Sequence, residues 1–407
     1  MAEQYEGTLE KLKMDYALLP KEELADFGNK SKSLYIGIPY ETNYNEKRIP
    51  LTPNSVEGLV NRGNRIVIES GAGVASGFSD QDYIQVGADI VFSKEEVFKA
   101  STIIKSTPIN VEEIPLLLPN QVLVSPILLP KLNVSTLKHI MEKKVTALAF
   151  EYIKGDYDTY PFMRSMSEIA GNYAILTAAK YLSNEYGHGI LLGGITGHPP
   201  TKVVILGAGS VGEAAARAAL GLGARVLVFD DNISRLMRLQ NDLGRRIYTS
   251  VIDSGNLRDK IARAHVVIGA LKPINGKTPC VVSEDMVAGM KAGSVIIDVS
   301  IDHGGCFESS RVTDNKNPVF TKHGVVHYCV PNIASNVSRT ASYALSNIIT
   351  PFLKSASDCG GIENFIKQNA GFRHGTYLYK GSLTKSFLAE KFDLKFTNLE
   401  LLLSVDF

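Results

Sequence analysis

The sequence has no surplus of charge of either sign. Its 407 residues include 43 lysines and arginines against 42 aspartates and glutamates, which gives a formal net charge of +1 at pH 7. A chain so balanced produces no field that would attract nucleic acid or an acidic partner, so we expect neither. It also contains no apolar run close to 18 residues, and we therefore expect no membrane span and no membrane partner.

Cysteine is scarce as well. The four cysteines are widely spaced, with neither a CxxC pair nor the spacing of metal ligands: Cys280, Cys306, Cys329 and Cys359. This pattern predicts buried free thiols in a reducing compartment and no metal site. The N-terminal residues carry acids and lack the apolar segment of a secretory signal. Together these features predict a cytoplasmic protein.

One stretch of the chain indicates a specific ligand. Residues 202–230 read KVVILGAGSVGEAAARAALGLGARVLVFD: a strand, a turn with Gly207, Gly209 and Gly212, an Ala-rich helix, and a strand that ends at Asp230. The glycines would give a tight turn, close approach of the backbone to a diphosphate, and close helix–strand contact. The helix N-terminus would face the phosphates, and the acid would bind ribose hydroxyls and repel a 2′-phosphate. The stretch therefore predicts an NAD site, with a βαβ turn that binds no ligand as the alternative.

Strands alternate with helices on both sides of this stretch. A length of 407 residues allows two domains, and the alternation predicts parallel sheets covered by helices on both faces. We predict an α/β fold with two Rossmann-like domains linked by long helices. The C-terminal helices should return to the first domain and make it discontinuous. The predicted parts are an N-terminal extension at 1–33, a substrate domain at 34–163 plus 338–407, and an NAD-binding domain at 164–337.

Several local predictions accompany this scheme. The periodicity of apolar residues predicts long helices at 165–186 and 338–353. A short surface helix is expected within the N-terminal extension. Thr52 should cap a helix that begins at Pro53, because threonine is a common N-cap and proline suits the first helical position.

Six motifs occur in order along the chain: IGIPYETNYNEKRIPLTP (36–53), ESGAGVASGFSD (69–80), MSEIAGNYA (166–174), LGAGSVG (206–212), IDVSIDHGGCFESSRVT (297–313) and YCVPNIASNVSRTASYALSN (328–347). Together they resemble the alanine dehydrogenase family, which shares its fold with the nucleotide-binding subunit of proton-translocating transhydrogenase. The resemblance covers residues 34–390. The segments GGCFESSRVT and TASYALSN are more specific than the glycine turn, and both look closer to alanine dehydrogenase.

The resemblance implies an activity. Members of the family oxidise L-alanine by hydride transfer to NAD and hydrolyse the resulting iminium to pyruvate and ammonia, and they often assemble as homo-oligomers, commonly hexamers. Such chemistry needs a cation for the substrate carboxylate and polar groups that handle the amine protons. By resemblance, Arg48 binds the carboxylate, since a guanidinium can pair it with two hydrogen bonds. Asp302 matches the family's active-site aspartate. A turn-capping role before Gly304 is the alternative for Asp302.

Five further positions match residues that bind the cofactor in the family. By this resemblance, Ser167 faces the diphosphate, Arg235 lies beside the adenosine ribose, and three residues line the nicotinamide side: Leu271, Asn332 and Ile333.

The first domain departs from the family at two places. The family's catalytic lysine lies two residues before a proline, whereas here Lys105 lies three residues before Pro108 and Ser106 has the expected position. Because side chains alternate along a strand, Lys105 reaches the site only if a bulge restores its direction. Lys105 is therefore a candidate for catalysis and substrate binding. The family's catalytic histidine is replaced by Leu128, which cannot transfer a proton.

The missing histidine leaves three functions open. The first is an NAD-dependent amino-acid dehydrogenase, most simply for L-alanine. The second is a related oxidoreductase with another substrate or hydride acceptor, including a transhydrogenase-like subunit. The third is an NAD-binding protein without catalysis. His303 and His327 are the candidates to replace the lost acid or base.

Overall fold

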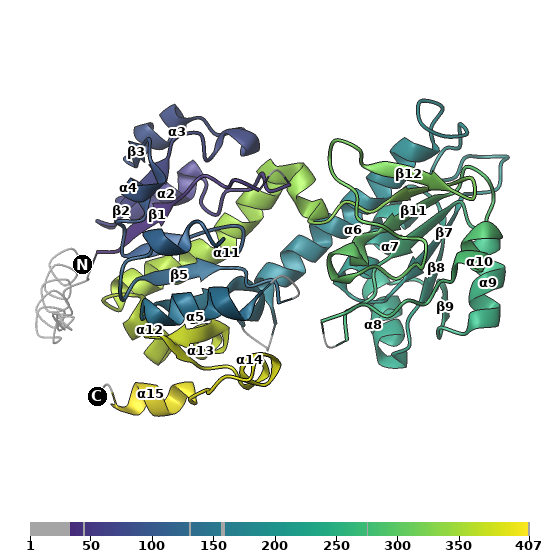
Figure 1. Ribbon diagram of the computed structural model, residues 1–407. Coiled ribbons are helices and arrows are strands. Elements are labelled where there is room, and N and C mark those ends of the chain that lie inside the picture. The colour runs from purple at the N-terminus through teal and green to yellow at the C-terminus, as the bar shows by residue number, and fades with distance from the viewer. Residues whose placement is uncertain (1–32, 44, 130–131, 156–158, 275, 406–407) are drawn as a thin grey trace, which may run out of the picture.

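The computed structural model describes residues 33–43, 45–129, 132–155, 159–274 and 276–405. They form two α/β units, each built on a largely parallel sheet, with the helix α6 (Pro161–Leu182) running between them (Figure 1). The predicted α/β fold with two Rossmann-like sheets is confirmed. The surface helix expected in the N-terminal extension lies outside the described residues.

The first sheet has the strand order β15-β14-β6-β5-β4-β1-β2-β3 among the described residues. Its strands are β1 (Tyr35–Ile38), β2 (Arg65–Glu69), β3 (Asp89–Val91), β4 (Thr102–Ile104), β5 (Val122–Ser125), β6 (Thr146–Ala149), β14 (Thr376–Tyr379) and β15 (Ser382–Leu383). The strands from β6 to β3 in this order are parallel, whereas β14 and β15 pair antiparallel at the other edge. The C-terminal part of the chain thus pairs with the first sheet, to which it adds strands as well as helices.

The second sheet has the order β12-β13-β11-β10-β7-β8-β9 in the described part of the chain. Its strands are β7 (Lys202–Leu206), β8 (Arg225–Phe229), β9 (Tyr248–Ser250), β10 (Val266–Gly269), β11 (Val295–Asp298), β12 (Val319–Lys322) and β13 (Val325–Tyr328). All pairs are parallel except β12 with β13. The order reverses between β7 and β10, and ligands of open α/β sheets bind at such a point, outside the carboxyl ends of the strands.

Helices cover both faces of each sheet, so that each sheet has one apolar cluster on either side. The first unit contains α2 (Pro53–Val60), α3 (Asp80–Gln85), α4 (Lys94–Val97), α5 (Val134–Glu142), α11 (Ser338–Asp358), α12 (Ile362–Gln368), α13 (Ala370–Gly375), α14 (Ser386–Phe392) and α15 (Leu399–Val405). The second contains α7 (Ser210–Gly221), α8 (Ile233–Leu243), α9 (Ser254–Ala262) and α10 (Glu284–Ala288). The central strands are continuous buried runs, as expected for strands covered on both faces.

Some local predictions need correction. The helix α6 runs from Pro161 to Leu182, so both ends lie four residues before those of the predicted range 165–186. Its start at Pro161 is explained because proline suits the first turn of a helix. The helix α11 continues through Pro351 to Asp358. Thr52 has the N-cap position of α2, but its side chain makes no cap bond and instead lies 3.3 Å from the Ser346 hydroxyl.

The contact between α6 and α7 brings two helix backbones together at Gly171. A Cβ atom at this glycine would lie 2.3 Å from the Val211 carbonyl oxygen and 2.7 Å from the Ala214 Cβ. Only glycine allows this approach, so the helix that joins the two units also supports the helix after the glycine turn.

We expect Gly171→Ala to lower the free energy of unfolding by about 1–3 kcal/mol, because the added methyl group forces α6 and α7 apart. Urea unfolding measures the change. The control is Gly221→Ala in α7, where nothing lies within 4 Å of the added Cβ. Equal stabilities of the two variants would show that the close approach is not a constraint.

Candidate active site

The glycine turn after β7 has the geometry that its sequence predicts. Gly207 has φ of +112°, and a Cβ there would lie 2.3 Å from the Ala270 carbonyl oxygen. A Cβ on Gly212 would lie 1.9 Å from the Gly207 carbonyl oxygen, so this glycine permits close packing of α7 on β7. Nothing lies within 4 Å of a Cβ on Gly209. The turn is therefore crowded at its ends and open at its middle.

The opening at Gly209 coincides with the start of α7. Gly209 is the N-cap of this helix, and no side chain caps it. The first amide groups of the helix and the positive end of its dipole thus face the space beside the turn, where they favour a negatively charged group. These residues fit the diphosphate of a dinucleotide.

Asp230 lies at the carboxyl end of β8 and is 4% exposed. Its Oδ2 accepts a hydrogen bond from the backbone N–H of Ala208 and its Oδ1 accepts one from Asn232, both at 2.8 Å. The Arg235 guanidinium lies 3.8 Å from the same carboxylate. The backbone bonds fix the orientation of the carboxylate, and each oxygen keeps acceptor capacity for a ribose hydroxyl.

The other predicted cofactor residues come from elements near this edge. Leu271 follows β10, and its carbonyl oxygen accepts a bond from the Ser300 hydroxyl at 3.2 Å. Asn332 and the buried Ile333 follow β13. Ser167 is half-buried on α6.

Asp302 lies four residues beyond the end of the nearest preceding strand. The strand β11 ends at Asp298, and Asp302 lies within the following 3₁₀ helix, Val299–His303. Both carboxylate oxygens of Asp302 accept from the backbone N–H of Asn332, at 3.1 and 3.2 Å. The carboxylate therefore joins the loop after β11 to the loop after β13.

The turn-capping role considered for Asp302 belongs to Asp298, which sequence reasoning missed. Asp298 is 1% exposed and accepts hydrogen bonds from Ser300 N–H, Cys306 N–H and the Ser310 hydroxyl. Burial raises the pKa of Asp298 to about 6, although these donors lower it. A pattern that combines an acid at a strand end with GG and small polar residues eight to twelve positions later would have indicated this role.

Arg48 lies in the loop between β1 and α2, with a side chain only 11% exposed. Its Nε donates to Glu46 Oε1 at 2.7 Å and its Nη2 to Glu46 Oε2 at 2.5 Å, a parallel pair of bonds. Burial lowers the pKa of Arg48, but the carboxylates of Glu46, Glu41 and Asp302 outweigh burial and the pKa is raised. The guanidinium is thus a permanent cation at this position.

The same carboxylate connects Arg48 to the second unit. Glu46 Oε2 accepts a hydrogen bond from Asn332 Nδ2 at 3.0 Å. Since Asn332 also donates its backbone N–H to Asp302, a chain of contacts runs from Arg48 through Glu46 and Asn332 to Asp302. The structure therefore brings together three residues that the sequence assigns to one site.

Three serines hold the Arg48 loop against the start of α11. The backbone N–H groups of Lys47, Ile49 and Thr52 donate to hydroxyl oxygens at 2.8, 2.9 and 3.0 Å respectively. The acceptors are Ser335, Ser342 and Ser346. Ser342 and Ser346 belong to the TASYALSN segment, so this segment fixes a loop from the N-terminal part of the chain.

Lys105 follows β4 and is buried, at 1% exposure. Its ammonium lies 2.9 Å from Glu41 Oε2 and 2.9 Å from Glu113 Oε1. Burial lowers the pKa of Lys105, but the two carboxylates outweigh burial and raise it. Glu41 also accepts from the Ser106 N–H at 2.7 Å. Lys105 is thus held in a buried ion-pair cluster, close enough to the site that Glu41 also influences Arg48.

Leu128 lies in a loop after β5 with φ of +42°, an uncommon conformation for a leucine. Its N–H donates at 3.0 Å to Glu151, whose pKa is raised by burial. Of the two possible replacements for the lost histidine, His327 is fully buried between the Ser309 hydroxyl and the Val325 carbonyl oxygen. Within the described residues, the Nδ1 of His303 is buried without a hydrogen-bond partner.

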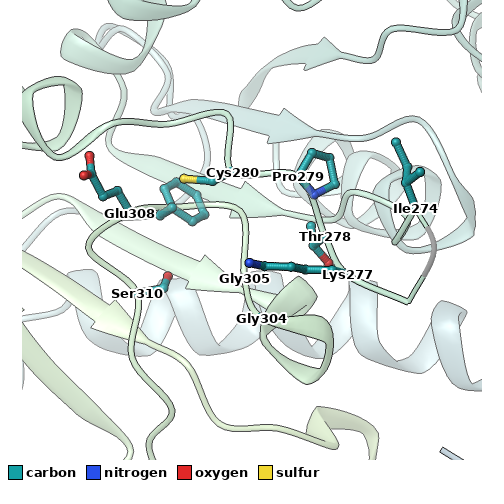
Figure 2. Close-up of a pocket in the computed structure, with 10 residues that line it drawn as sticks. Ile274, Lys277, Thr278, Pro279, Cys280, Gly304, Gly305, Glu308 and Ser310 are labelled. Atoms are coloured by element: carbon teal, nitrogen blue, oxygen red, sulfur yellow. The ribbon is translucent and has the colours of Figure 1, made fainter. Parts of the chain in front are cut away.

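An open cavity of about 510 Å³ lies beside this region, between Ile274 and residues 277–280 on one side and residues 304–310 on the other (Figure 2). Lys277, Cys280, Glu308 and Ser310 contribute side chains to it. The cavity borders Gly304, and so it adjoins the segment that carries Asp302 and His303.

Two family descriptions match the chain. The alanine dehydrogenase/PNT N-terminal domain matches residues 37–170, and the alanine dehydrogenase/PNT C-terminal domain matches residues 174–386. The chain belongs to the alanine dehydrogenase/PNT family. This membership confirms the family that the six motifs indicate, and the protein is an NAD-dependent oxidoreductase.

Similar proteins support this assignment. An alanine dehydrogenase of Methanococcus maripaludis is 37% identical over 371 residues, which cover 90% of this chain and 99% of the relative. Alanine dehydrogenase 2 of Staphylococcus aureus is 37% identical over 367 residues, or 90% and 98% of the two chains. A solved L-alanine dehydrogenase has a TM-score of 0.81 at 34% identity, covering 88% of this chain and 99% of the other.

A more distant structure shares the fold of this family. A transhydrogenase from Sinorhizobium meliloti has a TM-score of 0.72 at 23% identity, with 86% of this chain and 99% of the other covered.

The described residues also bear on metal binding and membrane spanning. They contain no group of three or more histidine, cysteine and acidic side chains that could hold a metal ion. None of the helices they form is long and apolar enough to cross a membrane. All four cysteines are free thiols, but only Cys306 and Cys329 are buried as predicted, whereas Cys280 is exposed and Cys359 half-buried.

We expect Asp298 to make stability depend on pH. Its pKa of about 6 exceeds the ordinary value of 3.8, so between these values the native state binds more protons than the unfolded state. The free energy of unfolding should therefore fall by up to about 3 kcal/mol as pH rises from 4 to 6. Asp298→Asn should flatten this slope in urea unfolding, and the exposed Asp231→Asn should leave it unchanged. A slope that persists in Asp298→Asn would refute the assignment.

Proposed function

We propose that the protein catalyses the reversible oxidative deamination of L-alanine: L-alanine, NAD⁺ and water give pyruvate, ammonium, NADH and a proton. The single observation that carries this proposal is the chain of contacts from Arg48 to Asp302 across the two units. It places a buried cation, suited to a substrate carboxylate, beside the loops that follow β11 and β13. The alanine dehydrogenases named above support L-alanine as the substrate.

Each predicted residue has a proposed task in this reaction. Gly207, Gly209 and Gly212, with the start of α7, receive the diphosphate, together with Ser167 of α6. Asp230 and Arg235 hold the adenosine ribose. The residues proposed for the nicotinamide side are Leu271, Asp302, Asn332 and Ile333. When bound there, NAD supplies the acceptor for the hydride of the substrate Cα.

The proposed tasks on the substrate side follow from charge. Arg48 binds and orients the substrate carboxylate, which fixes the substrate Cα relative to the second unit. Asp302 takes part in handling the amine protons, since a carboxylate can accept them. For Lys105 we propose that its charge holds Glu41 in place, because its ammonium already lies between two carboxylates.

The replacement of the family histidine by Leu128 favours a second candidate. A family member without an acid or base at this position could retain nucleotide binding and act on another substrate, or lack turnover. We also propose a homo-oligomer, by analogy with the family, and a cytoplasmic location.

We expect the purified protein to produce NADH from NAD and L-alanine at alkaline pH, because the deamination releases a proton. Absorbance at 340 nm with a panel of L-amino acids measures this activity. Turnover with another amino acid instead of L-alanine would show that this other amino acid is the substrate. Tight NADH binding without turnover of any amino acid would favour the alternative that this chain is an NAD-binding protein without catalytic activity.

We expect Lys105→Met to destabilise the fold by about 3–5 kcal/mol, because it leaves the buried Glu41 and Glu113 carboxylates without their shared cation. Glu113 would keep Lys94, which lies 3.0 Å from it. Thermal unfolding and the alanine assay are measured together. The exposed Lys99→Met is the control. A variant of unchanged stability that loses turnover would instead show that Lys105 acts on the substrate.

A further inference from the structure

Glu46 is a buried carboxylate whose side chain is 1% exposed and which accepts five hydrogen bonds. Its Oε1 accepts from Arg48 N–H at 2.9 Å, Arg48 Nε at 2.7 Å and the Ser335 hydroxyl at 3.3 Å. Its Oε2 accepts from Arg48 Nη2 at 2.5 Å and Asn332 Nδ2 at 3.0 Å. Both oxygens are therefore saturated, and the carboxylate cannot turn without breaking several contacts.

These contacts determine which part of the Arg48 guanidinium remains for a ligand. A guanidinium presents its donors in a fixed plane, and Glu46 takes the edge formed by Nε and Nη2. The edge formed by Nη1 and Nη2 is left, and the Met166 sulfur on α6 lies 3.2 Å from Nη1. A carboxylate that pairs with Arg48 through two bonds must approach this remaining edge.

The donors to Glu46 come from both units of the protein. Asn332 has φ of +56°, and it donates its backbone N–H to Asp302 and its side-chain amide to Glu46. Ser335 accepts from the Lys47 N–H and donates to Glu46. The orientation of Arg48 is thus set by the segment that follows β13, although Arg48 itself lies near the start of the chain.

We propose that Glu46 is a positioning residue for the substrate: it holds Arg48 so that the Nη1 and Nη2 edge receives the substrate carboxylate. This inference rests on the proposed function, in which Arg48 binds that carboxylate. Glu46 does not touch the substrate and acts through Arg48. Its loss should therefore weaken substrate binding more than the chemical step.

The test uses Glu46→Gln, which keeps the size of the side chain and removes its charge and one acceptor oxygen. We expect the KM for L-alanine to rise by about 10- to 100-fold, the effect of losing charge-assisted hydrogen bonds that orient Arg48. The kcat should change by less than about threefold, and the Kd for NADH, followed by its fluorescence, by less than about twofold. A loss of kcat by about 10- to 100-fold with an unchanged KM would overturn the inference.

A second measurement does not depend on turnover. Propionate is a carboxylate of the same chain length as L-alanine and lacks the amine, so it reports the carboxylate site alone. Its affinity for the NADH-bound protein, measured by calorimetry, should fall by about 10- to 100-fold in Glu46→Gln and at least as much in Arg48→Ala. Unchanged propionate affinity in Glu46→Gln would overturn the inference.

Two further variants make the result unambiguous. Glu57→Gln is the matched control, because Glu57 is an exposed glutamate of the adjacent helix α2. If Glu46→Gln does not fold, Glu46→Asp keeps the charge but withdraws it by one methylene group, and it should also raise the KM and weaken propionate. A folded Glu46→Asp protein with normal values of both would overturn the inference.

The propionate measurement also separates this inference from the proposed function. If the wild-type protein binds propionate through Arg48 but does not oxidise L-alanine, the proposed function fails, and the inference stands if Glu46→Gln weakens propionate. If the wild-type protein binds neither L-alanine nor propionate, both fail, because Arg48 then receives no carboxylate.

Discussion

The arrangement of the site depends on the burial of one cation. A guanidinium that is 11% exposed must be paired, because an isolated buried charge is very unfavourable. Glu46 supplies the pair, and its own burial requires further donors, which come from Ser335 and Asn332. The buried pair of Arg48 and Glu46 thus has all its hydrogen-bond donors only when the loop after β1 lies against the segment after β13. The bonds from Ser335 and Asn332 to this ion pair are thereby among the contacts that join the two units.

The backbone of the second unit needs no comparable ion pair. Its strands are buried apolar runs, and the glycine turn is shaped by steric contacts at Gly207 and Gly212. The acid that closes this turn, Asp230, is fixed by backbone N–H groups rather than by an arginine in tight contact. The nucleotide side is therefore shaped by steric contacts and backbone bonds, and the substrate side by charge. The nucleotide side and the substrate side meet at Asn332, whose backbone N–H donates to Asp302 and whose side-chain amide donates to Glu46.

The fold and the glycine turn could be predicted from the sequence, because both depend on local patterns. Continuous apolar runs indicate buried parallel strands, and the spacing of Gly207, Gly209 and Gly212 reflects contacts within a few residues. The strands β12, β14 and β15 were missed because they are short and pair antiparallel, outside the alternation of strands and helices that indicates the parallel strands. The environment of Lys105 was also missed, since its two carboxylates come from loops that no periodicity connects. Asp298 was overlooked because its hydrogen-bond donors Cys306 and Ser310 lie eight and twelve residues later, in a loop whose path back to the strand end the sequence does not show.

The serines of α11 have a consequence for how the protein can be divided. The helix begins where the second unit ends, and its Ser342 and Ser346 accept from the backbone N–H groups of Ile49 and Thr52, nearly three hundred residues earlier in the chain. Ser335, which precedes the helix, accepts from the Lys47 N–H on the other side of Arg48. Neither unit, produced separately as one continuous piece of chain, would contain Arg48 together with all the residues that orient it. The two parts of the protein are therefore not modular. A recombinant exchange of the nucleotide-binding part with that of another protein would have to leave this helix with the first unit and keep Asn332 and Ser335, which bond Glu46.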